Sequence, residues 1–182
     1  MMSVELAIAQ TKNWVSKVIV DLNLCPFAAR EVINNTIRYR AFSQEQIGTL
    51  LEALKDEFFL LDESDDIETS LLIYIDELTD FEEYLDFLDL ANDVLIGCGY
   101  EGVYQLASFH PSYQFESTKL NDPENYTNRS PYPTIHIIRE KSLERALEGY
   151  TNPESIPERN IKLTRKLGLT HMQTLLQKCI NG

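Results

Sequence analysis

Three residues in the sequence carry side chains that could do catalytic or ligand-binding chemistry: Cys25, His110 and His136. Cys25 stands in the stretch DLNLCPFAAREV, directly before a proline, and proline is favoured at the first position of a helix. We therefore expect Cys25 at the N-cap of a short helix, where free amides and the helix dipole lower the pKa of a thiol. The alternative is a small apolar cysteine that packs between Leu24 and Phe27.

One histidine is predicted at the end of a strand and the other within a strand. His110 precedes Pro111, which favours extended backbone at a strand end, so the imidazole either reaches a cleft or satisfies loop backbone groups. His136 lies between isoleucines, and a half-buried imidazole must find hydrogen-bond partners. Strand alternation gives each face of this strand its own set of side chains: His136, Ile138 and Glu140 on one, and Ile135, Ile137 and Arg139 on the other.

The segment TNRSPYP presents polar side chains next to two prolines, which restrict the backbone. Arg129 could bind a carboxylate or phosphate of a small anionic substrate through two parallel hydrogen bonds. Equally, Arg129 could order its own loop through an ion pair with one of the many carboxylates. The predicted substrate-binding residues are Asn128, Arg129, Ser130 and Arg139.

Hydrophobic periodicity predicts the elements that hold these residues. Helical spacing runs from residue 4 to about 22, from 47 to 61 and from 81 to 95, and short helices are expected after 142, 157 and 170. Four stretches have strand character: TIRYRAF, SLLIYI, VYQLASF and TIHIIRE. A long loop spans residues 110–134, and loops of this length are typically functional. This order predicts an α+β fold, with one mixed or antiparallel four-stranded sheet and helices on at least one face, in a single domain over residues 1–182.

Composition excludes several classes of partner. The formal net charge is -13, which disfavours nucleic acids and anionic membranes. No segment is long and apolar enough to span a membrane, and the start of the chain lacks the pattern of a secretory leader, so we expect a cytoplasmic protein. Three widely spaced cysteines, Cys25, Cys98 and Cys179, suggest reduced thiols rather than a disulfide framework.

The stretches LCPFA, FHPSYQF and NRSPYPTIHIIRE resemble those of an uncharacterised bacterial family, domain-of-unknown-function family 1415, over nearly the whole chain. The resemblance implies that the motif residues matter to the family, and it supplies no substrate or cofactor. These motif residues are Cys25, Pro26, His110, Pro111, Asn128, Arg129, Ser130, Pro131, Pro133, His136, Arg139 and Glu140.

Three functions remain open from the sequence. The first is an enzyme with Cys25 as nucleophile, His110 or His136 as base and Arg129 holding an anionic substrate. The second is a zinc, iron or copper site formed by Cys25, His110 and His136. The third is a non-enzymatic module that binds a small molecule or a protein through a loop surface, formed by Arg129 with Tyr113, Tyr126 and Tyr132.

Overall fold

The chain folds around one four-stranded sheet in the computed structural model, which describes residues 3–182. The single-domain prediction for residues 1–182 includes Met1 and Met2, which lie outside the described residues. The strands follow the spatial order β1 (Ile37–Phe42), β2 (Thr69–Tyr74), β4 (Thr134–Arg139) and β3 (Tyr104–Phe109). β1 and β2 are parallel, whereas β4 is antiparallel to both of its neighbours. The prediction of an α+β fold with one mixed sheet is therefore confirmed.

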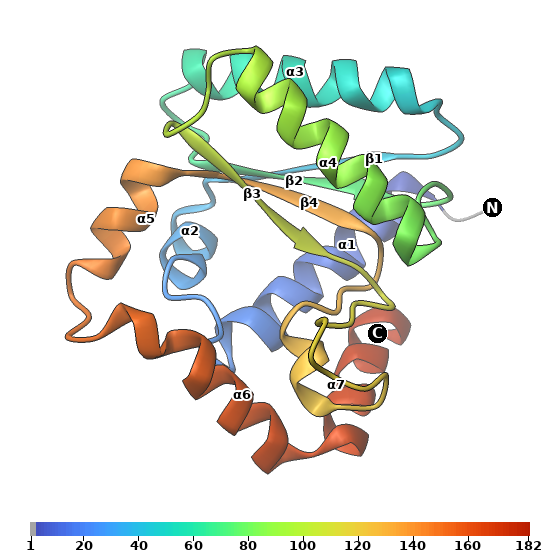
Figure 1. The fold of residues 1–182 in the computed structure, drawn as a ribbon, viewed down its shortest axis with the longest axis vertical. Helices are drawn as coiled ribbons and strands as arrows, with labels where there is room; N and C mark the ends of the chain where they lie inside the picture. Colours follow the sequence, from blue (N-terminus) through green and yellow to red (C-terminus); the bar gives the residue numbers. More distant parts are fainter. Residues whose placement is uncertain (1–2) are drawn as a thin grey trace.

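Helices cover both faces of the sheet (Figure 1). On one face lie α3 (Ile47–Glu63) and α4 (Phe81–Gly97). The opposite face carries the helices from the two ends of the chain. These are α1 (Val4–Trp14), the π-helix η1 (Val15–Val20), α2 (Ala28–Asn34), α6 (Ile156–Leu167) and α7 (Leu169–Asn181). Two 3-10 helices, η2 (Pro123–Thr127) and η3 (Pro153–Ser155), and α5 (Glu140–Leu147) complete the described elements.

The alternation of side chains along the strands divides the core into two layers. Leu72 and Ile137 point into the apolar layer beneath α3 and α4. Leu71 packs on the other side, against Trp14 and η1. All six residues of β2 are buried, which is why this strand reads as a continuous apolar run. β4 alternates as predicted, because Ile137 faces α3 and α4 while His136 faces the opposite side of the sheet.

The segment around Cys25 departs from the predicted local structure. The first helix does not continue regularly to residue 22, because its last turns form the π-helix η1. Pro26 does not open the next helix: α2 begins at Ala28, with Phe27 as its N-cap. Cys25 therefore lies in the turn that precedes α2 rather than at its N-cap.

No helix in residues 3–182 is both long enough and apolar enough to cross a membrane.

Candidate functional site

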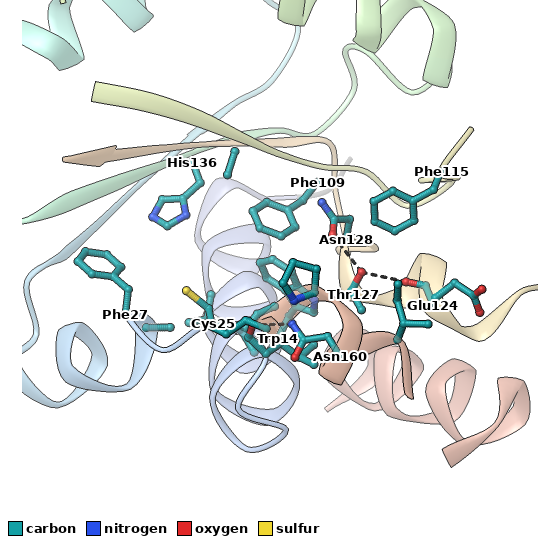
Figure 2. A pocket seen from close by; sticks show the side chains of 18 of the residues that line it. Trp14, Cys25, Phe27, Phe109, Phe115, Glu124, Thr127, Asn128, His136 and Asn160 are labelled. Atoms are coloured by element: carbon teal, nitrogen blue, oxygen red, sulfur yellow. Dashed lines mark hydrogen bonds between the residues drawn. The ribbon is translucent and has the colours of Figure 1, made fainter. Parts of the chain in front are cut away.

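A cavity of about 700 Å³ lies on the sheet face that carries His136. Leu71 and Phe109 form its floor on the sheet, and Trp14 lines it from α1. Asn160 and other residues of α6 close it from the side opposite the sheet (Figure 2). Gln105 lines the rim and is exposed, so the cavity opens to solvent near the outer strand β3. The volume falls within the range of about 300–1,000 Å³ that is typical of small-molecule sites.

The π-helix shapes one wall of this cavity. The amide of Asp21 donates to the Ser16 carbonyl at 3.0 Å, and the amide of Leu24 donates to the Ile19 carbonyl at 2.9 Å. Both bonds span five residues, so the turn is wider than in an α-helix, a local feature that is frequent at functional sites. Ile19 lines the cavity, and the bond to Leu24 fixes the backbone immediately before Cys25.

Cys25 lines the cavity from the loop between η1 and α2. Burial raises the pKa of its thiol, and backbone hydrogen bonds from Phe27 and Ala28 only partly oppose this shift. The predicted lowering of the thiol pKa is therefore wrong, because desolvation of the thiolate outweighs the two amides. At neutral pH the Cys25 side chain is a thiol.

His136 faces the same cavity from β4, and Figure 2 shows its ring and the Cys25 side chain entering the cavity from opposite walls. The hydroxyl of Thr69 donates to the Ile137 carbonyl at 2.5 Å, so its oxygen accepts from Nε2 of His136 at 2.7 Å. Burial lowers the pKa of His136 to about 4. The imidazole is thus neutral, with its proton on Nε2 and a lone pair on Nδ1.

His110 does not join this cavity, although it was predicted beside Cys25. It follows Phe109, whose ring faces the cavity, and successive strand side chains point to opposite faces. His110 is fully buried between the rings of Phe81 and Tyr84, each 5.1 Å away between ring centroids. Its Nε2 lies 3.0 Å from the Leu78 carbonyl, and its Nδ1 accepts from the Ser112 amide at 3.0 Å. His110 therefore connects the loop that contains Leu78 to the start of the long loop at Ser112.

Arg129, the residue predicted to bind an anion, forms its hydrogen bonds with backbone carbonyls of its own loop. Arg129 is buried and donates to the carbonyls of Tyr113 at 3.0 Å and Leu120 at 2.8 Å. Its guanidinium also lies over the ring of Tyr126, 4.6 Å from the centroid. This arrangement orders the long loop with carbonyls and a ring, rather than with the ion pair considered from the sequence.

The three other predicted substrate-binding residues divide between the cavity and the interior. Only Asn128 lines the cavity, where its side-chain amide donates to the Ser108 carbonyl at 3.0 Å. Ser130 is fully buried and donates to the Tyr132 carbonyl at 2.5 Å. Arg139 lies on the opposite sheet face, where it donates to the Tyr104 hydroxyl at 3.0 Å and to carbonyls near the end of α3. Predictions of substrate contact for Arg129, Ser130 and Arg139 therefore lack support in the geometry.

Two of the functions left open by the sequence lose their geometric basis. A metal centre needs Cys25, His110 and His136 together, and His110 lies outside the cavity. Across residues 3–182, no three histidine, cysteine, aspartate or glutamate side chains are grouped to hold a metal ion. A binding surface on the loop would need exposed side chains, and Arg129, Tyr126 and Tyr132 are all buried.

Several cavity residues escaped prediction because their sequence context is ordinary. Trp14 reads as a core residue of an amphipathic helix, and Thr69 as the start of a strand. The pair formed by Glu124 and Arg165 joins η2 to α6, with the guanidinium Nη2 and the carboxylate 2.5 Å apart. No local pattern links two residues so far apart along the chain.

Comparison with protein families adds a classification. The model of the family described as "Protein of unknown function (DUF1415)" matches residues 6–174, almost the whole chain. The chain belongs to this family. The match confirms the resemblance carried by the three motif stretches. For this DUF1415 chain, no match was found among curated proteins or among solved structures.

Proposed function

We propose that this chain is an enzyme that acts on a small, largely apolar molecule bound in the cavity, with Cys25 as its nucleophile and His136 as its base. One observation carries the proposal: a thiol and a neutral imidazole, contributed by different elements, face the same cavity. Aromatic and aliphatic side chains form most of the surrounding wall, including Trp14, Leu24 and Phe109. Such walls favour a ligand with an apolar body.

The chemistry follows from the protonation states. The sulfur of Cys25 would attack an electrophilic carbon of the bound molecule, such as a carbonyl carbon, and form a new S–C bond. The thiol proton would pass to Nδ1 of His136, the only ring nitrogen that carries a lone pair once Thr69 accepts from Nε2. The bond between the attacked carbon and its leaving group would break, and the leaving group would take the proton from His136.

A second candidate is a binding protein that does no chemistry on its ligand. The raised pKa of the Cys25 thiol favours this candidate, since a protonated thiol is a weak nucleophile without a base. In that case Cys25 and His136 are simply part of the cavity wall.

Acyl transfer from an uncharged ester separates the two candidates. We expect p-nitrophenyl hexanoate to acylate Cys25, with release of p-nitrophenol and a matching gain of mass on the intact protein. If His136 takes the proton, the rate should stay nearly constant between about pH 5 and pH 8, because the imidazole remains a base above its pKa of about 4. A thiol that reacts alone would instead speed up about tenfold per pH unit, because only its thiolate attacks.

Matched variants complete this experiment. His136→Gln should slow acylation about a hundredfold or more and restore the steep pH dependence. Cys25→Ala should abolish acylation, whereas Cys98→Ala, at the end of α4 and outside the cavity lining, should leave it unchanged. Binding of the ester without acylation of Cys25 would favour the second candidate. Acylation that persists in Cys25→Ala would refute the assignment of the nucleophile.

A further inference from the structure

We propose that the ligand of this cavity is uncharged and carries a hydrogen-bond acceptor, such as a carbonyl oxygen, that binds the indole N–H of Trp14. The inference rests on the proposed function, because it describes the molecule on which Cys25 would act. It replaces the small anionic substrate expected from the sequence with a neutral carbonyl compound that has an apolar body.

The indole nitrogen is the first reason. Trp14 lines the cavity and is 1% exposed, and its Nε1 is a buried donor with no hydrogen-bond partner among the described residues. Buried donors are nearly always paired in folded proteins, because an unpaired one loses its bonds to water without replacement. The ring of Phe109 stands edge-on at 5.0 Å between centroids and supplies no oxygen. A hydrogen-bond acceptor on the ligand would satisfy this N–H, while the apolar side chains that form most of the wall contact the rest of the molecule.

The charges of the cavity lining are the second reason. Two carboxylates, Asp122 and Glu124, and one guanidinium, Arg165, line it. Arg165 donates from both Nε and Nη2 to Glu124, at 3.1 and 2.5 Å, so its charge is already compensated. Figure 2 shows the Glu124 carboxylate turned away from Cys25 and His136. His136 is neutral, which leaves no uncompensated cation in the lining to hold an anion.

The arginines that could have bound an anion are occupied elsewhere. Arg129 donates to two loop carbonyls, and Arg139 lies across the sheet from the cavity. An anion in the cavity would lose its hydration and gain no ion pair, which is a large energetic cost. An ester, thioester or amide would bring an acceptor without this cost.

Three probes of similar size test the inference by isothermal titration calorimetry. Methyl 3-phenylpropanoate is neutral with an acceptor, 3-phenylpropanoate is its anion, and pentylbenzene is neutral without an acceptor. We expect the ester to bind about tenfold more tightly than pentylbenzene, which is the usual size of one net hydrogen bond, and the anion to bind more weakly than the ester.

The chain offers a matched control, because Trp14 is its only tryptophan. Biosynthetic replacement of tryptophan by benzothienylalanine therefore changes this residue alone, and it removes the N–H while keeping the two fused rings. In the replaced protein the ester should lose its advantage over pentylbenzene, whose own affinity should not change. If the ester still binds more tightly than pentylbenzene after the replacement, the indole N–H of Trp14 is not its hydrogen-bond donor. If 3-phenylpropanoate binds most tightly of the three probes, the ligand is not neutral.

The proposed function and this inference fail in different ways. Equal binding of ester and pentylbenzene refutes the inference, while acylation of Cys25 by p-nitrophenyl hexanoate would still support the enzyme. Failure of all three probes to bind refutes the ligand class. Loss of Cys25 acylation with a retained preference for the ester refutes the enzyme alone.

Discussion

At the scale of single residues, the imidazole of His136 links the cavity to the pH dependence of folding. Burial lowers its pKa from an ordinary 6.5 to about 4. Between these two values the unfolded chain binds a proton that the folded chain does not. The contribution of His136 to stability is therefore complete above pH 6.5 and is lost as the pH falls toward 4.

The variant His136→Gln tests this linkage. On lowering the pH from about 7 to about 4.5, the wild type should lose about 2–3 kcal/mol more of its free energy of unfolding than the variant. Urea unfolding at both pH values measures the difference. His171→Gln is the matched control, because it replaces an exposed histidine outside the cavity lining. Equal losses in wild type and His136→Gln would contradict the lowered pKa.

A second prediction for a single residue concerns the contribution of Arg129 to stability. Its guanidinium holds the carbonyls of Tyr113 and Leu120, so Arg129→Lys leaves buried hydrogen bonds unmade. We expect a loss of about 2 kcal/mol in the free energy of unfolding, measured with urea. Arg30→Lys, at a side chain that is 67% exposed, should change stability little. If Arg129→Lys kept its stability but no longer bound the ester, Arg129 would have to contact the ligand rather than hold the loop.

Among the elements, α6 forms the outer wall of the cavity, and three of its side chains bond to distant segments. Asn160 donates to the Leu24 carbonyl at 2.8 Å, next to Cys25, and Arg159 donates to the neighbouring Asn23 carbonyl. Arg165 pairs with Glu124 of η2. These contacts connect the C-terminal part of the chain to segments far away in sequence. Access to Cys25 should therefore depend on how firmly α6 is held.

Removal of the hydrogen bond between Asn160 and the Leu24 carbonyl tests whether α6 limits access to Cys25. Asn160→Ala frees the Leu24 carbonyl, and we expect N-ethylmaleimide to alkylate Cys25 several-fold faster, together with faster amide exchange in α6. Mass spectrometry of digests distinguishes Cys25 from Cys98 and Cys179. Asn92→Ala on α4, which removes a bond to the Leu88 carbonyl far from α6, is the matched control. An unchanged alkylation rate in Asn160→Ala would show that α6 does not limit access.

At the scale of the whole molecule, 29 acidic and 16 basic residues give a charge of -13. Self-repulsion of this size destabilises a compact state. Raising the concentration of NaCl from about 0.01 M to about 0.1 M shortens the Debye length from about 30 Å to about 10 Å. We expect the melting temperature to rise by a few degrees over this range, as followed by circular dichroism. The rise should vanish near the isoelectric point, and a fall in melting temperature at neutral pH would mean that ion pairs outweigh the repulsion.

Apolar spacing in the sequence predicted the strands, the helices α3 and α4 and the alternation along β4, because this spacing is a local property of each helix and strand. It did not predict the π-helix η1 or the start of α2 at Ala28. The stripe from residue 47 to 61 became α3, and the apolar run SLLIYI became the buried strand β2. The opposite faces of His136 and Ile137 followed from the same local geometry.

The packing of elements that are distant in sequence determines which reactive side chains lie in one cavity. His110 and Phe109 are neighbours in sequence, but the strand sends one into a buried stack and the other into the cavity. The pKa of Cys25 depends on the elements that surround it, because their burial of the thiol raises the pKa more than the amides of Phe27 and Ala28 lower it. Trp14, Cys25 and His136 share a cavity because α1, the loop before α2, and β4 pack together. Such long-range packing leaves no period in the sequence, so composition and spacing could name Cys25 and His136 but could not bring them together.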